Sequence, residues 1–275
     1  MLRLNGMKQR MNAEEIWRIV RGEGPVVAAA IHDGHAVRAE VAELLALSDA
    51  ERLREEDPFS GAWTEVAPTR IIGLNSRFEV DLNRPRETAV YRVPDDAWGL
   101  TVWKEPLPPD VMDRSLGEYD AFYAAVRDVL DDVQARHGQF VVYDLHTYNH
   151  RRGGPDAAPA APAANPEVNI GTGTMDRSYW APVVERFMRD LQAFDFAGRQ
   201  LDVRENVKFK GGGFGKWIHE HYPQSGCAMA IEFKKFFMDE CTGELCPEHH
   251  AAIQAALRST VPGVLEALGT LDPGS

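Results

Sequence analysis

Short apolar runs that meet polar residues recur along this 275-residue chain. The clearest spans residues 140–148, where the β-branched and aromatic residues of a buried strand give way to polar ones. A second run, 25–31, is followed directly by His32, and a third, 228–233, contains a single carboxylate, Glu232. Open α/β sheets bind their ligands at the carboxyl ends of their strands. The pattern therefore predicts functional side chains gathered at one edge of a sheet.

Helix-spaced apolar positions separate these runs, most clearly between residues 116 and 137. Further helices are predicted at 12–15, 40–47, 48–54, 179–194 and 249–268, the last broken near Pro262, and further strands at 70–74, 77–82 and 168–173. The Ala/Pro-rich tract 153–165 predicts a surface loop without a domain boundary. Alternating strands and helices favour one α/β domain over residues 1–275, with a mostly parallel or mixed sheet.

Asp144 and His146 lie two positions apart in the first of these strands. Successive side chains alternate between the faces of a strand, so both point to the same face. This spacing suits a histidine ligand and a carboxylate that steers the imidazole or the neighbouring backbone. A strand end capped by polar residues is the simpler alternative.

Composition narrows the class of protein. The net charge is −12 and the pI near 5.2, which argues against a nucleic-acid binder because such proteins need a basic face. No apolar stretch is long enough to span a membrane, and the N-terminus lacks the apolar region of a secretion signal. We therefore expect a cytoplasmic protein, and its oligomeric state stays open.

The three cysteines form no CxxC pair, which agrees with a reducing compartment. Cys241 and Cys246 precede His249 and His250, so a structural zinc cluster is one alternative for this segment.

The polar strand ends hold the groups that a zinc hydrolase needs. Such an enzyme requires two imidazoles and a carboxylate as ligands, a second carboxylate as base, and a cation for an anionic substrate. The candidate ligands are His32, His146 and either Glu56 or Asp57. Glu232 is the candidate base, and Arg77 and Arg84 are the candidate cations. Each has a structural alternative: Glu232 can pair with Lys210 or Lys234, and Arg84 can cap the sheet edge.

Four sequence stretches resemble the N-formylglutamate amidohydrolase family. The most specific is Ser76-Arg-Phe-Glu-Val-Asp-Leu-Asn-Arg-Pro85, and the others are Ile31-His-Asp-Gly34 with Asp144-Leu-His146, and Ile231-Glu-Phe-Lys-Lys-Phe-Phe-Met-Asp-Glu240. The family is similar to zinc carboxypeptidases and aspartoacylase. The resemblance implies a three-layer α/β/α, phosphorylase/hydrolase-like fold with a mixed sheet, and a metal-dependent hydrolase of a linear amide with one Zn²⁺ per chain.

The resemblance also implies residue roles. His32 and His146 match the zinc histidines, and Asp57 matches the carboxylate ligand, with Glu56 as second choice and His35 as a third possibility. Asn83 and Arg84 match a pair that binds the substrate carboxylate, and Arg77 resembles a second anion-binding arginine. Glu232 matches the general base.

The implied substrate is a small anionic N-acyl amino acid such as N-formyl-L-glutamate. The Lys234-Lys235 pair and the 153–165 loop depart from the family pattern and leave the true substrate open. A zinc carboxypeptidase-like peptidase, a deacylase of another N-acyl amino acid, and a non-catalytic anion-binding homologue are the alternatives.

Overall fold

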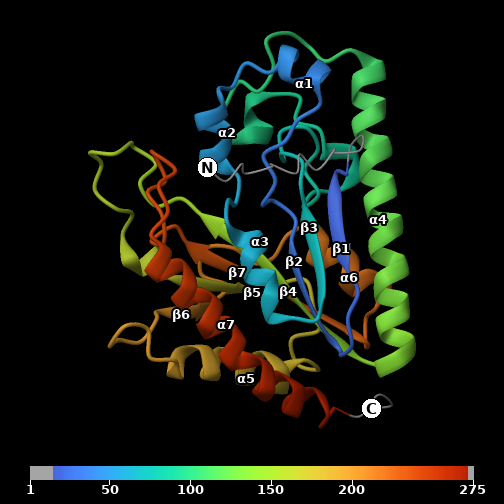
Figure 1. Cartoon of the computed structure of the whole chain (residues 1–275), viewed down its shortest axis with the longest axis vertical. Helices are drawn as coiled ribbons and strands as arrows, with labels where there is room; N and C mark the ends of the chain where they lie inside the picture. Colours follow the sequence, from blue (N-terminus) through green and yellow to red (C-terminus); the bar gives the residue numbers. More distant parts are fainter. Residues whose placement is uncertain (1–14, 272–275) are drawn as a thin grey trace, which may run out of the picture.

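The computed structural model describes residues 15–271, which form one mixed seven-stranded sheet with helices on both faces (Figure 1). The strand order is β1-β3-β2-β4-β7-β5-β6. Strands β3, β2, β4 and β7 run parallel, while β1 and β5 each lie antiparallel to a neighbour. Their bounds are β1 Trp17–Val20, β2 Val26–Ala30, β3 Thr69–Gly73, β4 Phe140–Tyr148, β5 Val168–Gly171, β6 Val203–Glu205 and β7 Gly226–Lys234.

Helices cover the two faces of the sheet in two separate apolar cores. On one face the core includes residues of α1 (Ala39–Leu44), α4 (Pro109–His137) and α6 (Gly213–His221). On the other it includes residues of α3 (Ser60–Trp63), α5 (Ala181–Ala193) and α7 (Pro247–Leu268). The three-layer α/β/α architecture expected from the sequence is confirmed (Figure 1).

The central strands are buried on both faces, which explains their continuous apolar runs. Every residue of β2 and β4 is buried, including the polar positions at the end of β4. From β2 the chain continues into β3 on one side of it, while β4 pairs with its other side. The order of strands therefore reverses between β2 and β4, which is where open α/β sheets place their ligand sites.

Several predicted elements are confirmed with shifted ends. Helix α2 (Asp49–Glu55) begins after Ser48, whose side chain and that of Glu51 form a capping box. Helix α4 starts at Pro109, seven residues before the predicted start, because its first turns carry exposed polar residues that hide the apolar period. The predicted 12–15 helix falls almost wholly outside the described residues. The 153–165 tract is irregular apart from one short 3₁₀ turn, Pro162–Ala164.

Two predictions are wrong. Residues 77–82 form turns, although their polar and apolar residues alternate as in a strand. Both sets are buried: Phe78 and Val80 enter the core, and Glu79 and Asp81 form ion pairs with Arg38 and Arg77. Helix α7 continues through Pro262. Proline has no N–H to donate to the carbonyl of Arg258, four residues earlier, but both residues are exposed, so water can hydrogen-bond to that carbonyl. No helix within residues 15–271 is long and apolar enough to cross a membrane.

A buried ionic cluster joins α4 to the turn before α1. The guanidinium of Arg38 lies 2.9 Å from Glu79 and 2.7 Å from Glu118, and it also donates to Ser115 at 2.8 Å. Burial first, and then the negative charge of Glu79, raise the pKa of Glu118 to about 7. Glu40 lies 3.6 Å from the same guanidinium, so one cation faces three carboxylates.

This cluster predicts a pH dependence of folding. The pKa of Glu118 is higher in the folded than in the unfolded chain, so the folded state holds more protons between about pH 4.5 and 7. Stability should therefore fall as pH rises through this window. In Glu118→Gln the drop in melting temperature between pH 5 and pH 8 should be smaller than in the wild type. The exposed Asp113→Asn on the same helix is the control. An unchanged drop in Glu118→Gln would contradict this role.

Candidate active site

A cavity of about 330 Å³ opens at the carboxyl ends of β2, β4 and β7. Its wall includes His32, His146 and Asp57, with Glu232 beside them. His32 follows β2 by two residues, and in the parallel ladder of β4 and β7 His146 is the register partner of Glu232. The side chains predicted from separate strand ends thus meet at one place.

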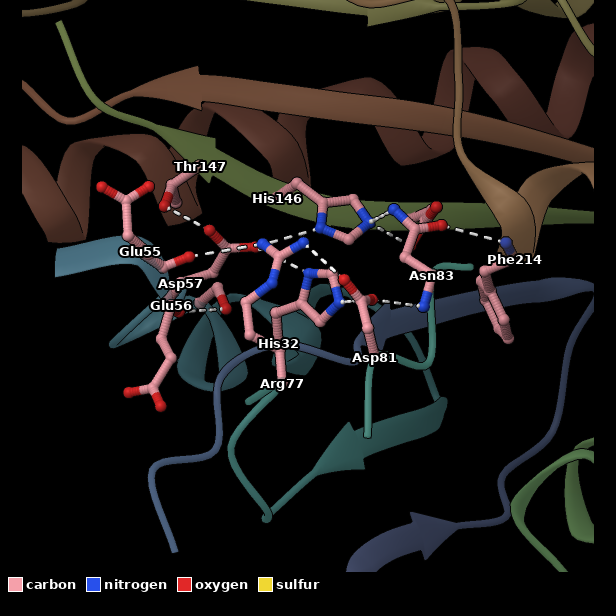
Figure 2. Close-up of polar contacts among 12 residues, drawn as sticks. His32, Glu55, Glu56, Asp57, Arg77, Asp81, Asn83, His146, Thr147 and Phe214 are labelled. Atoms are coloured by element: carbon pink, nitrogen blue, oxygen red, sulfur yellow. Dashed lines mark hydrogen bonds and ion pairs between the residues drawn. The ribbon is translucent and has the colours of Figure 1, made fainter. Parts of the chain in front are cut away.

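Three donor atoms converge in this cavity (Figure 2). The Oδ2 atom of Asp57 lies 3.0 Å from Nδ1 of His146 and 3.5 Å from Nδ1 of His32. All three residues are buried, and each offers a ligand atom within 4.8 Å of the others. Among residues 15–271 no other group of histidine, cysteine and acidic side chains comes together in this way.

A carboxylate lies beside the far nitrogen of each imidazole. Nε2 of His32 is 2.7 Å from Oδ1 of Asp81, and Nε2 of His146 is 3.0 Å from Oδ1 of Asp144. The hydrogen bond to Asp81 keeps the proton of His32 on the outer nitrogen and leaves the inner lone pair free for a metal, whereas Asp144 lies at ion-pair distance from His146 without hydrogen-bond geometry. The short strand spacing of Asp144 and His146 predicted their contact, whereas the pairing of Asp81 with His32 comes from a distant turn.

The arrangement fits a metal ion. Nδ1 of His32 is fully buried and has no hydrogen-bond partner among residues 15–271, which is costly unless a ligand takes its lone pair. Two imidazoles and a carboxylate are also the donor set of many catalytic zinc sites, which keep a fourth position open.

Electrostatics in the group favour a negative Asp57. Burial alone would raise the pKa of Asp57, but the hydrogen bond from His146 and the positive charge of His146 and His32 hold that pKa well below its usual range. Burial likewise opposes charge on His146, yet Asp144 and Asp57 raise the pKa of His146 well above its usual value. The cluster attracts positive charge, which a metal ion would supply.

The backbone after α2 places Asp57 in the group. Its N–H donates to the carbonyl of His32 at 2.9 Å, and its Oδ1 accepts from the hydroxyl of Thr147 at 2.7 Å (Figure 2). Glu56 points elsewhere: its carboxylate accepts from Ser76 and lies 2.5 Å from Nδ1 of His35. Of the three candidates for the third ligand, the structure therefore brings only Asp57 to the two histidines.

The alternative cluster near the C-terminus does not assemble. His249 Nδ1 lies 3.1 Å from the carbonyl of Phe236, and His250 Nε2 lies 2.9 Å from that of Phe59. Neither these histidines nor Cys241 and Cys246 belong to the potential metal group found among residues 15–271.

Arg77 lines the cavity and completes the surroundings of Asp81. Its Nη2 donates to Asp81 at 2.8 Å, its Nη1 to the carbonyl of Glu55 at 3.3 Å, and its Nε to the hydroxyl of Tyr91 at 3.1 Å. Its guanidinium also stacks over the ring of Trp98, 4.7 Å from the centroid. Burial would raise the pKa of Asp81, but the charge of Arg77 and of His32 holds it well below its usual range.

Asn83 also lines the cavity, fixed by a glycine-rich turn. Its Oδ1 accepts the N–H of Phe214 at 2.9 Å, and its Nδ2 lies 3.4 Å from Nε2 of His146. A Cβ at Gly212 would fall 2.2 Å from Oδ1 of Asn83, so only glycine permits this approach.

Arg84 lies outside the cavity wall in this structure. Its guanidinium stacks over Tyr91, 4.9 Å from the ring centroid, and donates to the carbonyl of Asp96. Its Nε is 3.5 Å from Asp81. Of the three predicted substrate-binding residues, the structure brings Arg77 and Asn83 to the cavity.

Glu232 faces the cavity without a protein partner. Within residues 15–271 no hydrogen bond or ion pair engages its carboxylate, and neither Lys210 nor Lys234 pairs with it. Burial raises the pKa of Glu232 to about 7, an effect that the charge of His146 opposes. A carboxylate with a pKa near neutrality can exchange protons at physiological pH.

The sequence did not single out several other residues of the wall. Trp98, Arg152 and Lys208 come from irregular segments, where no apolar period marks them. Lys235 also lies in the wall, and it belongs to the Lys234-Lys235 pair that the sequence marked as a departure from the family pattern. Burial lowers the pKa of Lys235 to about 8, so its ammonium group is still charged in most molecules at pH 7.

The sequence profile of N-formylglutamate amidohydrolases matches residues 24–238 of the chain. The chain belongs to this family. A search of curated proteins found no match.

Solved structures show that the fold is shared with the family. An N-formylglutamate amidohydrolase from Ralstonia eutropha JMP134 aligns with 94% of this chain and 99% of its own, at 18% identity and a TM-score of 0.67. A gene product of Agrobacterium tumefaciens aligns over 93% and 97%, at 17% identity and a TM-score of 0.69. At such identities the likeness concerns the fold. Family membership makes the protein an amidohydrolase, and the cavity holds a potential metal group.

Proposed function

We propose that this protein is a zinc-dependent hydrolase that cleaves the amide of an N-acyl acidic amino acid, with N-formyl-L-glutamate as the first candidate. The observation that carries the proposal is the convergence of three metal donors beside an unpaired carboxylate in one cavity. Family membership supports the reaction class. The proposal places one metal ion in each chain.

His32, Asp57 and His146 would hold the metal through Nδ1, Oδ2 and Nδ1. A zinc ion bound there would polarise the substrate carbonyl and lower the pKa of water from about 16 towards 7. Asp81 keeps the imidazole of His32 oriented for ligation through its hydrogen bond, and Asp144 favours the cationic surroundings of His146 at ion-pair distance. Thr147 fixes the rotation of the Asp57 carboxylate, so that Oδ2 stays with the histidines.

Glu232 acts as the general base in this proposal. It takes a proton from the attacking water and returns it to the nitrogen of the leaving amine. Its burial without an ion pair favours both steps, because a carboxyl that titrates near pH 7 serves as base and then as acid.

Arg77 and Asn83 position the substrate, and Arg84 supports them. Arg77 uses three of its five N–H groups on Asp81, Tyr91 and Glu55, which leaves donors for a carboxylate. Arg84 reaches the substrate only if it releases the carbonyl of Asp96.

Hydrolysis of a substrate panel by the zinc-loaded protein tests the proposal. N-formyl-L-glutamate, N-acetyl-L-glutamate and a dipeptide with C-terminal glutamate should be compared under identical conditions. The proposal expects the largest kcat/KM for the formyl compound. A preference for the dipeptide would favour a carboxypeptidase-like enzyme, and failure to hydrolyse any N-acyl acidic amino acid would contradict the proposal.

Arg77→Lys should raise KM for acidic substrates by about tenfold or more. Lysine keeps the charge but loses the planar fork that holds a carboxylate through two parallel hydrogen bonds. Steady-state kinetics on N-formyl-L-glutamate, with metal content measured on the same samples, checks this result. Arg86→Lys is the control, because Arg86 pairs with Asp120 at the surface. An unchanged KM in Arg77→Lys would remove Arg77 from substrate binding.

A further inference from the structure

Lys235 is a buried cation in the wall of the active-site cavity. Lys235 comes directly after the last residue of β7, and it is only 1% exposed. Its Nζ donates to the backbone carbonyls of Arg54 at 2.6 Å and Glu56 at 2.7 Å. These carbonyls lie at the end of α2, directly before Asp57.

The two hydrogen bonds do not exhaust the ammonium group. A lysine ammonium has three donors, and the backbone carbonyls occupy two of them. Within the described part of the chain, Nζ has no third acceptor and no carboxylate at ion-pair distance. A buried charge without a counter-ion is costly, and the cavity is the open space that Lys235 borders.

The other cations of the cavity differ from Lys235. Arg77 is engaged by Asp81, and Arg152 holds the carboxylate of Glu55 through two hydrogen bonds of 3.1 Å. Lys208 is exposed, and its Nζ donates to the side chain of Asn165. Lys235 is therefore the buried cation of the wall that forms no ion pair with any described residue.

We propose that Lys235 is a specificity-determining residue that receives a carboxylate of the substrate through its third N–H. This inference rests on the proposed function for the substrate class, and it adds a lysine to the arginines as a receptor for a carboxylate. The bonds to Arg54 and Glu56 fix the ammonium in place, so that little side-chain entropy is lost on binding. A substrate with a second carboxylate would then bind more tightly than its monoamide.

Equilibrium binding to the zinc-loaded protein tests this inference without requiring turnover. Glutarate carries two carboxylates, and its monoamide, glutaramate, carries one. Calorimetry on the wild type should show tighter binding of glutarate by at least about tenfold. In Lys235→Met this preference should shrink to about threefold or less. Because the measured quantity is a ratio within one protein, losses of metal or folded fraction affect both ligands alike.

Two further variants complete the design. Lys104→Met is the matched control, because Lys104 Nζ also donates to a backbone carbonyl, that of Glu43 at 2.8 Å, but lies exposed. It should keep the wild-type preference. If Lys235→Met does not fold, Lys235→Gln carries the same test, since its amide can still donate to the carbonyls without charge.

The outcomes separate this inference from the proposed function. Loss of the preference in the Lys235 variant supports the inference, even if the wild type hydrolyses no N-formyl compound. An unchanged preference overturns it, even if the wild type is fully active. A wild type that binds glutarate no more tightly than glutaramate overturns it as well.

Discussion

Glu232→Gln should lower kcat by roughly 100-fold or more while the protein stays folded and keeps its metal. Glutamine has the same shape as glutamate but cannot take a proton from water, and removal of a general base commonly costs 10²–10⁴-fold. Glu232 has no ion pair to lose within residues 15–271, so the melting temperature should not fall. The measurements are kcat, metal content and melting temperature on one preparation.

The alternative for Glu232 is a structural role, and it predicts the opposite pattern. A structural carboxylate would give Glu232→Gln a lower melting temperature and nearly intact kcat in the molecules that remain folded. Glu220→Gln is a suitable control, because Glu220 lies exposed on α6, 3.7 Å from Lys216. Its kinetics should match those of the wild type.

Alanine at His32 or His146 should remove the metal and lower kcat/KM by about 10³-fold or more. Each imidazole supplies one of three ligands, and without the metal the attacking water loses its activation. Metal analysis and kinetics on each variant check this result. His137→Ala is the control, because His137 lies exposed at the end of α4. Full metal occupancy in both His32→Ala and His146→Ala would show that the metal site is assigned wrongly.

The position of the site could be predicted from the sequence because strand ends carry it. Apolar runs in the sequence mark β2, β4 and β7. The polar residues beside or within these runs, His32, His146 and Glu232, line one cavity. The third donor could not be chosen by spacing alone. Glu56 and Asp57 are neighbours, and only the direction of the chain after α2 sends Asp57 to the histidines and Glu56 to Ser76.

Segments without regular structure account for what the sequence did not predict. The turns at 77–82 bury both their polar and their apolar residues, so alternation mimicked a strand. Asp81 reaches His32 across 49 positions of sequence, a contact that no local pattern announces. Lys235 is buried against the end of α2, about 180 positions earlier in the chain, and hydrogen-bonds to it. Such contacts depend on how distant loops pack.

Titration of the metal-free protein with zinc tests the central claim most directly. The purified protein is first stripped with a chelator, and bound zinc and turnover of N-formyl-L-glutamate are then measured in the same samples. The account predicts that activity is absent without metal and rises in proportion to bound zinc, reaching its plateau at about one ion per chain. Full activity in the stripped protein, or one bound zinc without formate release, would contradict it.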